Sequence, residues 1–258
     1  MIQRAGLLLQ TQDTDRRFSG LSRLYGDDMA QRIRRAHVVV VGIGGVGSWA
    51  AEALARSGVG QLTLIDMDHV SESNINRQLH ALSTTLGQSK VLAMAQRIGL
   101  INADCHVNLV DDFISPDNID ALISEDLDVL IDATDEVSAK VALATWAIQH
   151  HKAMVTVGAA GGKKQAHLVE MNDLTHATHD PLLAQVRYRL RKNGVIASDK
   201  NPCGIQAVFS KEPIVRPAVA TGDSCNSDLN CHGYGSLVTV TATFGQCAAG
   251  WGLNHFSH

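Results

Sequence analysis

The chain alternates between short apolar runs and segments in which apolar residues recur every three or four positions. Residues 38–41 are four consecutive valines, which is typical of a strand buried on both faces of a parallel sheet. Apolar positions then follow helical spacing over residues 46–57, and a second apolar strand covers residues 62–65. This order of strand, helix and strand predicts a βαβ unit.

The same alternation continues to about residue 158. We expect a helix over residues 88–100, a strand over 106–113, a helix that begins with Ser115 as N-cap and Pro116 as its first residue, a strand over 128–135, a helix over 137–151 and a strand over 153–158. Helices between strands require parallel pairing with right-handed crossovers. The predicted fold is therefore α/β, a doubly wound, mostly parallel, Rossmann-like sheet with its ligand crevice at the carboxyl ends of the strands.

The second half of the chain is less regular. We expect strands over residues 164–171 and 205–212, a helix with a basic face over 181–193, and a long loop over 213–235 of the kind that closes over substrates. Residues 237–253 fit either a strand over 237–244 or one buried helix, but their polar residues argue against a membrane span. We predict an N-terminal arm (1–16) and one domain (17–258), with a nucleotide half (37–158) and a substrate half (159–258).

The sequence GIGGVG joins the first strand to the first helix. Gly42 permits a tight turn, Gly44 removes a Cβ that would block a phosphate, and Gly47 lets the helix lie close to the sheet. Gly45 lowers the obstruction further. Backbone N–H groups at the start of the helix can bind phosphate oxygens, so the loop predicts a nucleotide site. A glycine turn that binds nothing is the alternative.

Polar residues that follow the second strand favour ATP over NAD as the nucleotide. Asp66 ends that strand and Asp68 follows it, where a carboxylate can accept hydrogen bonds from ribose hydroxyls. Asn74, Arg77 and Lys90 come next, and two cations suit a triphosphate better than a dinucleotide. Taken alone, the two cations could equally be solvated surface residues.

The sequence DATD ends the fourth predicted strand. Asp132 and Asp135 can supply a carboxylate ligand to Mg²⁺, which usually takes one or two carboxylates with phosphate oxygens and water. The alternative for Asp135 is the N-cap of the following helix. Because Asp135 follows the glycine loop and the other candidate nucleotide residues along the chain, the role of a magnesium ligand is favoured over that of an N-cap.

Composition narrows the partners of the chain. The 258 residues carry a net charge of −4, so nucleic acid could bind only at a local basic patch. Two clusters are candidates for contacts with nucleic-acid phosphates: Lys163, Lys164, Arg187, Arg189, Arg191 and Lys192. A solvated helix face is the alternative for the second cluster. The five cysteines are an odd number without a Cys-x-x-Cys pair, which indicates a reducing compartment and no paired-cysteine zinc site.

Together the motifs GIGGVG, LIDMD, NINRQ, GQSK and DATD resemble the ThiF/MoeB superfamily, the ubiquitin-activating enzymes and their bacterial sulfur-transfer relatives, which adenylate carboxylates. The longer segments RFSGLSRLYGDDM, GIGGVGSWAAEALARSGVG, LIDMDHVSESNINRQLHAL and VDDFISPDNID are most similar to the tRNA threonylcarbamoyladenosine dehydratases of that superfamily. The resemblance implies a cytoplasmic, homodimeric, ATP-dependent ligase. It would cyclise threonylcarbamoyladenosine beside the anticodon of tRNAs that read codons beginning with A, and could be linked to a cysteine desulfurase and its sulfur acceptor.

The resemblance also implies roles for single residues. The glycines would bind the nucleotide phosphates, Asp66 the ribose, Arg77 and Lys90 the polyphosphate, and Asp135 the magnesium ion. Arg23 is the candidate for an arginine that reaches the ATP of the partner subunit. Cys231 lies where the superfamily has a cysteine in a loop over the site, but ring closure needs no enzyme nucleophile, so an ordinary loop thiol fits equally well.

The chemistry implied is activation of the threonyl carboxylate by ATP, most simply at the α-phosphate, after which the tethered carbamoyl group displaces AMP. An adenylyltransferase for a ubiquitin-like sulfur carrier is the nearest alternative, although its usual zinc cysteines are missing. An NAD-dependent oxidoreductase and a non-catalytic sulfur-relay adaptor are weaker alternatives. His176 and His179 have a spacing compatible with a helical metal pair, yet without a third ligand we expect surface residues.

Overall fold

A seven-stranded sheet forms the centre of the computed structural model, which describes residues 14–198, 201–214 and 234–256. Its order is β3-β2-β1-β4-β5-β7-β6, and every neighbouring pair is parallel except β6 with β7. The strands are β1 (His37–Val41), β2 (Gln61–Ile65), β3 (His106–Val110), β4 (Val129–Asp132), β5 (Ala153–Val157), β6 (Val169–Asp173) and β7 (Gln206–Ser210). The predicted mostly parallel α/β sheet is therefore confirmed.

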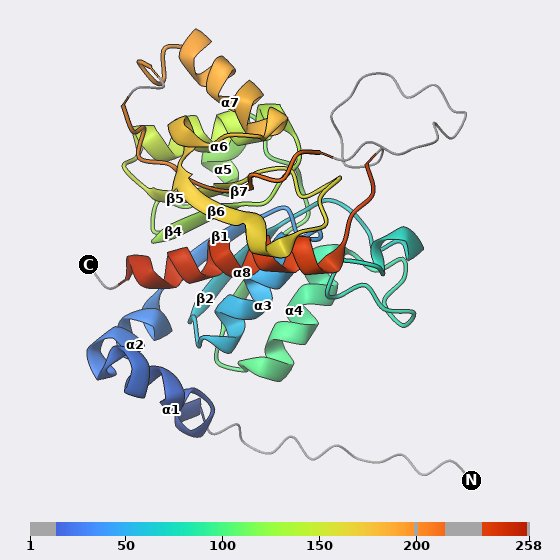
Figure 1. Cartoon of the computed structure of the whole chain (residues 1–258). Coiled ribbons are helices and arrows are strands. Elements are labelled where there is room, and N and C mark those ends of the chain that lie inside the picture. The colour runs from blue at the N-terminus through green and yellow to red at the C-terminus, as the bar shows by residue number, and fades with distance from the viewer. Residues whose placement is uncertain (1–13, 199–200, 215–233, 257–258) are drawn as a thin grey trace.

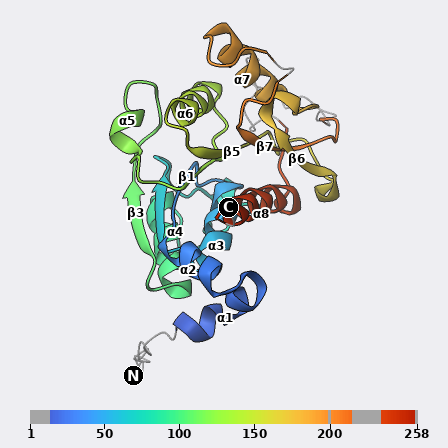
Figure 2. The same cartoon turned by 90° about the vertical axis from the view of Figure 1, so that its left-hand side faces the viewer.

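Helices cover both faces of this sheet (Figure 2). One layer contains α3 (Gly47–Arg56), α4 (Lys90–Ile101) and α8 (Val238–His255), and the other contains α5 (Ile119–Leu122), α6 (Val137–Gln149) and α7 (Pro181–Lys192). Alternate valines of β1 supply both cores: Val38 and Val40 pack toward the first layer, Val39 and Val41 toward the second. A strand buried on both faces explains why this run contains no polar residue.

Two N-terminal helices, α1 (Thr14–Tyr25) and α2 (Asp27–Arg35), lie together at the amino end of β1 (Figure 1). Arginine side chains of these two helices donate hydrogen bonds to carbonyl groups at the carboxyl ends of α4 and α8. Arg17 Nη1 donates to the carbonyl of Ile101 at 2.6 Å, where α4 ends, and Arg32 Nη1 donates to that of Phe256 at 3.4 Å, where α8 ends. Cations at the carboxyl ends of helices satisfy free carbonyls and oppose the helix dipole. Helix α1 begins inside the predicted arm, whose residues 1–13 lie outside the described part.

The last helix resolves the ambiguity at the carboxyl end of the chain. Residues 238–255 form α8, although the run VTVTATF has strand propensity. Val240, Phe244 and Ala248 recur at helical spacing and are fully buried in the first core. Packing against the sheet therefore decides the conformation. None of the helices in the described ranges is long and apolar enough to cross a membrane.

Several predicted boundaries differ by a few residues, and two elements begin clearly later than expected. Helix α5 has Asn118, not Ser115, as its N-cap, because the Asn118 side chain accepts from Ser115 N (2.8 Å) and donates to Phe113 O (2.7 Å), forming a turn that delays the helix. The predicted strand 164–171 begins only at Val169, after a short 3-10 helix, Ala166–Leu168. Most of the predicted loop 213–235 lies outside the described residues.

Candidate functional site: a nucleotide cavity at the carboxyl ends of the strands

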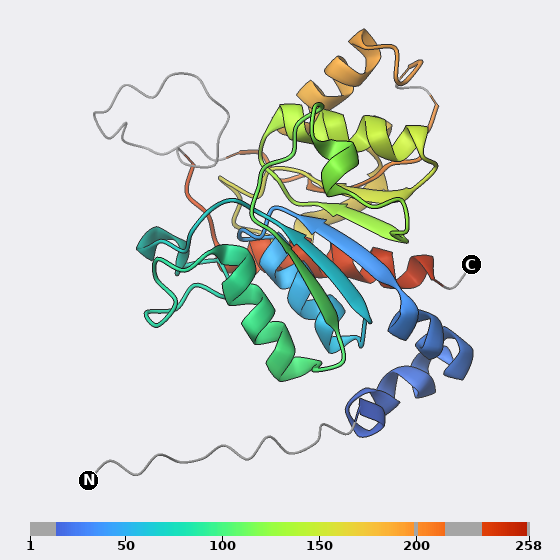
Figure 3. The same cartoon turned by 180° about the vertical axis from the view of Figure 1, so that it is seen from behind.

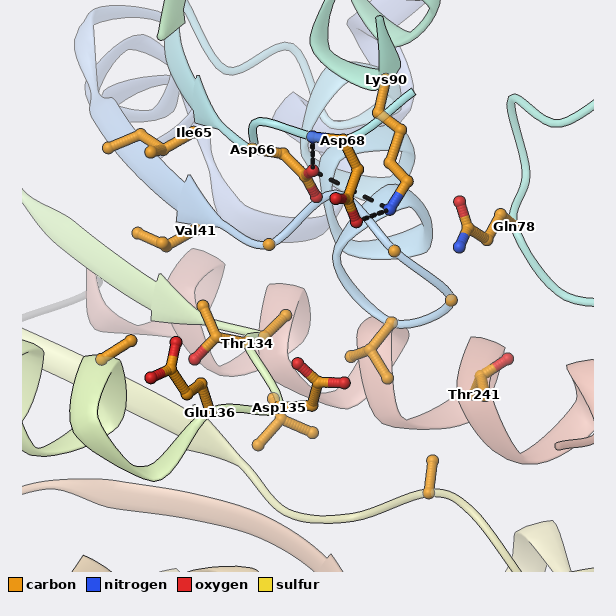
Figure 4. Close-up of a pocket in the computed structure, with 18 of the residues that line it drawn as sticks. Val41, Ile65, Asp66, Asp68, Gln78, Lys90, Thr134, Asp135, Glu136 and Thr241 are labelled. Atoms are coloured by element: carbon orange, nitrogen blue, oxygen red, sulfur yellow. Dashed lines mark hydrogen bonds and ion pairs between the residues drawn. The ribbon is translucent and has the colours of Figure 1, made fainter. Parts of the chain in front are cut away.

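A cavity of about 290 Å³ opens at the carboxyl ends of β1, β2, β4 and β5. Helices α1 and α2 lie at the opposite, amino ends of the strands. Figure 4 shows Asp66, Asp68 and Lys90 on one side of it and Asp135 and Glu136 on the other. Three of the four loop glycines, Gly42, Gly44 and Gly45, line it directly. The crevice therefore lies where a doubly wound sheet is expected to bind its ligand.

The glycine loop depends on its glycines for different steric reasons. Gly42 has φ 84°, and a Cβ there would lie 2.8 Å from the backbone of Ala133. A Cβ on Gly47, the first residue of α3, would overlap the carbonyl oxygen of Gly42 and lie 3.3 Å from Ala133 Cβ, so this glycine lets the helix begin close against the ends of β1 and β4, as predicted. Nothing lies closer than 3.9 Å to the Cβ position of Gly44, which leaves its side open to the cavity. The first turn of α3 has no side-chain cap, as in helix ends that bind anions.

Asp66 connects this loop to β2. Its Oδ2 accepts a hydrogen bond from Ile43 N at 2.6 Å, and its Oδ1 accepts one from Asp68 N at 2.9 Å. The Lys90 ammonium lies 2.6 Å from Asp68 Oδ2 and 3.8 Å from Asp66 Oδ1. Burial raises the pKa of Asp66, while Lys90 and the two N–H donors act against the rise. Lys90 is itself 6% exposed. Lys90 and Asp66 are therefore charged groups on the cavity wall that are largely removed from water.

The segment NINRQ forms the next part of the wall. Arg77 donates from Nη1 to Ser73 O and to Asn76 Oδ1, both at 2.9 Å, which fixes the guanidinium beside the cavity. Asn74 is turned inward, and its Oδ1 accepts from Ser71 N at 3.0 Å. Gln78, which the sequence analysis did not single out, is 5% exposed and its Oε1 has no partner among the described residues. A buried carboxamide oxygen on a cavity wall is a site for a ligand donor.

The two DATD aspartates are separated by the fold. Asp135 is exposed on the cavity wall, and Glu136, not Asp135, is the N-cap of α6. Asp132 is fully buried beneath the wall: it accepts from Thr156 Oγ1 (2.6 Å), Lys140 Nζ (3.0 Å) and both donors of Thr134. The expectation that Asp132 can supply a carboxylate ligand at the nucleotide site is therefore corrected, because its carboxylate is buried and already satisfied by the protein. It supports the loop that carries Asp135.

The residues present fit a nucleoside triphosphate with one magnesium ion. The open glycine loop, Arg77 and Lys90 line the same cavity, with the Arg77 side chain packed against Gly45, and the partnerless Gln78 oxygen lies on its wall. No group of three or more histidine, cysteine, aspartate or glutamate side chains that could form a metal site occurs in the described ranges. A magnesium ion bound by Asp135 would therefore take its other ligands from phosphate oxygens and water, as is usual for this ion.

Several cavity residues carried no signal in the sequence. Ser236, just before α8, and Thr241, in its first turn, line the cavity although they lie far along the chain from the glycine loop. Met67 and Phe113 line it as well and are 55% and 53% exposed, so they present apolar surface at its wall. The run DDFIS after β3 could have indicated Phe113, since it too follows a strand end.

The candidate basic residues fall into different environments. The prediction that Lys163 binds tRNA is wrong: the residue is 2% exposed, and its Nζ donates to the carbonyls of Ser210 (3.1 Å) and Glu212 (3.0 Å). Burial lowers its pKa, against the attraction of Asp180 and Glu212. Lys164 is exposed. On α7, Arg187 is partly covered and donates to Leu174 O, whereas Arg189, Arg191 and Lys192 are exposed.

The remaining candidates lie away from the cavity. Arg23 is exposed on α1, at the other end of the strands, so it could act only on the site of another subunit. His176 and His179 are exposed surface residues, as expected, and His179 is outside the short helix that contains His176. Cys231 lies outside the described residues.

Comparison with known proteins adds independent findings. The family model described as the ThiF family matches residues 16–254. A Haemophilus influenzae protein called tRNA threonylcarbamoyladenosine dehydratase is 45% identical over 233 residues, which cover 90% of this chain and 89% of that protein. The Escherichia coli protein of the same name is 43% identical over 247 residues and covers 92% of each chain. The likeness thus spans almost the full length of these proteins.

A solved structure shows the same likeness in three dimensions. The Escherichia coli tRNA N6-threonylcarbamoyladenosine dehydratase in complex with ATP aligns with a TM-score of 0.86 at 42% identity, covering 96% of this chain and 97% of that one.

Proposed function

The chain belongs to the ThiF family, and from that premise we propose that it catalyses the ATP-dependent dehydration of threonylcarbamoyladenosine in tRNA. The observation that carries the proposal is the likeness over nearly the whole chain to dehydratases, one of them solved with ATP. The cavity supports it, since a glycine loop, the Asp66 carboxylate and the two cations Arg77 and Lys90 line it together. The product is a ring closed between the threonyl carboxyl carbon and the carbamoyl group.

ATP supplies the leaving group that a carboxylate lacks. The chain's own residues provide orientation and charge. In this proposal Gly42, Gly44 and Gly45, with the first N–H groups of α3, bind phosphate oxygens, and Asp66 accepts hydrogen bonds from ribose hydroxyls; all four residues line the cavity. Arg77 and Lys90 stabilise negative charge that develops on the phosphates, which is the usual dominant contribution in such transfers.

Lys90 and Asp135 have a further role in this proposal. In the structure the Lys90 ammonium is paired with Asp68, so the lysine is held at the cavity wall before a polyphosphate competes for it. Asp135 is the proposed magnesium ligand, and its position is set by the buried Asp132–Lys140 pair beneath it. In ring closure the carbamoyl group bonds to the acyl carbon, AMP leaves and one carbamoyl N–H proton is lost to solvent. The step needs no enzyme nucleophile, because the carbamoyl group is tethered and effective molarities of about 10⁵ M or more are available to such reactions.

The proposal extends to the assembly and its partners. The active form is a cytoplasmic homodimer in which Arg23 of one subunit serves the cavity of the other, and a cysteine desulfurase with its sulfur acceptor is a possible partner. Lys164, Arg187, Arg189, Arg191 and Lys192 remain the candidate tRNA contacts. Cys231 has no required step, since closure is intramolecular.

Incubation with ATP, Mg²⁺ and tRNA that contains threonylcarbamoyladenosine tests the proposed function. We expect the modified nucleoside to lose the mass of one water, measured by mass spectrometry without base treatment. Arg77→Ala and Asp135→Ala should lose this activity while retaining the melting temperature of the parent protein. Unchanged tRNA together with pyrophosphate exchange that depends on a sulfur-carrier protein would instead favour the adenylyltransferase alternative.

A further inference from the structure

Helix α7 is the most basic helix of an acidic chain. Its twelve residues include Arg187, Arg189, Arg191 and Lys192 and no acidic residue, whereas the whole chain has a net charge of −4. The acid that precedes it, Asp180, is 4% exposed and accepts from Leu183 N (3.0 Å) and Ala159 N (2.8 Å) as the helix cap. Its charge is therefore directed into the domain and not along the helix.

The outer face of α7 combines this charge with an aromatic ring. Leu182, Leu183, Val186 and Leu190 form the buried stripe of the helix. The exposed residues of the helix include Gln185, Tyr188, Arg189 and Lys192, which we call the Tyr188 face. Tyr188 and Lys192 lie opposite the buried stripe, Arg189 lies on its flank, and Tyr188 is 59% exposed. Lys192 follows Tyr188 by four residues, which puts the two side chains next to each other on the helix. A ring left in water, with one cation next to it and a second on the flank of the helix, suits a nucleobase and its phosphates.

The helix starts at the cavity and leads away from it. Leu182, in its first turn, lines the cavity, and the helix then extends to the outer edge of the molecule, where it is orange in Figures 1 and 3. At 1.5 Å per residue, Tyr188 lies about 9 Å and Lys192 about 15 Å beyond Leu182 along the axis. With a rise of about 3.4 Å per nucleotide, these distances correspond to roughly three and four stacked nucleotides.

We propose that the Tyr188 face binds the single-stranded part of the anticodon loop next to the nucleoside that enters the cavity. The Tyr188 ring stacks on a base, and Arg189 and Lys192 contact backbone phosphates. This inference rests on the proposed function, because the nucleoside in the cavity fixes which part of the RNA reaches α7. Unpaired, splayed bases are what proteins recognise by stacking, so the surface fits a loop better than a duplex.

Binding of a fluorescently labelled anticodon stem-loop RNA, measured by anisotropy over a range of salt concentrations, tests the inference. Tyr188→Ala should weaken binding by about tenfold or more with the salt dependence unchanged, and Tyr188→Phe should bind like the parent protein. The double variant Arg189→Gln/Lys192→Gln should lower the slope of log K against log salt by about 1.4, the value for two single-strand phosphates. In steady-state assays over a range of RNA concentrations, both changes should raise the KM for RNA and leave kcat, the turnover at saturating RNA, unchanged.

The control is Arg35→Gln, which removes an exposed charge of α2 at the other end of the strands. It should leave the slope unchanged. A Tyr188→Ala protein that binds within about twofold of the parent protein, or a control that loses as much as the α7 variant, overturns the inference. Either of these two outcomes would overturn the role of α7 without contradicting the proposed function. A parent protein that binds ATP but no RNA would contradict the proposed function itself.

Discussion

At the scale of single residues, the buried pair of Asp132 and Lys140 is the contact on which the cavity wall most depends. Both side chains are fully buried, and their charged atoms lie 3.0 Å apart. Lys140→Met leaves an unpaired carboxylate in the interior and should lower the free energy of unfolding by about 3–5 kcal/mol, measured by urea denaturation. Adding Asp132→Asn should recover much of that loss. Equal losses in the single and double variants would show that the two groups are not coupled.

His80 predicts a dependence of stability on pH. It is 2% exposed, and burial together with the charges of Lys90 and Arg97 lowers its pKa to about 4. The unfolded chain protonates His80 near pH 6.5 whereas the folded chain does not, so stability is lost as the pH falls from about 6.5 toward 4. Between pH 7.5 and 5 this contributes about 2 kcal/mol. His80→Gln should reduce the measured change in unfolding free energy by that amount, and an identical pH dependence would contradict the account.

Among the site residues, the predictable ones were those whose role follows from chain order. Gly42, Asp66 and Asp135 each follow a strand, and parallel strands bring their carboxyl ends to one edge. Asp132 could not be placed, because its burial depends on Thr156 of another strand and Lys140 of the next helix. Lys163 could not be placed either, since the carbonyls that capture it follow some 50 residues later.

At the scale of elements, the contact between α8 and α3 sets the width of the first layer. A Cβ on Gly245 would overlap the carbonyl oxygen of Val46 and lie 2.9 Å from Trp49 Cβ, whereas one on Gly250 of the same helix meets nothing within 4 Å. Gly245→Ala should therefore destabilise the protein by about 1–3 kcal/mol. Gly250→Ala should stabilise it by roughly 0.5–1 kcal/mol, because alanine loses less backbone entropy in a helix. Thermal or urea unfolding measures both, and equal effects would contradict the packing.

The strands of the nucleotide half were predictable because burial on both faces leaves a continuous apolar run. Helix α8 was not, since VTVTATF has the composition of a strand and becomes helical only against the sheet. Helix α5 began late because a side chain, Asn118, competed with the helix for the backbone of Ser115. The local sequence pattern thus predicted the strands that are buried on both faces. It failed where one side chain set the start of a helix, as at α5, or where packing on the sheet set the conformation, as at α8.

At the scale of the whole molecule, the distance between Arg23 and the cavity of its own chain makes subunit exchange informative. Arg23→Ala and Arg77→Ala homodimers should both be inactive. A mixed dimer regains one complete site, from the Arg77 of one chain and the Arg23 of the other, so random exchange should restore about a quarter of the parent turnover. Native mass spectrometry verifies that mixed dimers form. Mixed dimers without activity would exclude this role of Arg23.

The most direct measurement follows one oxygen atom through the reaction. The central claim is that ATP activates the threonyl carboxylate in this cavity, so that a carboxylate oxygen leaves on phosphorus. The substrate tRNA would carry ¹⁸O in both carboxylate oxygens, and the nucleotide products would be analysed by mass spectrometry. The account predicts one ¹⁸O in AMP and the other in the carbonyl of the closed ring. Label released only into water would contradict it.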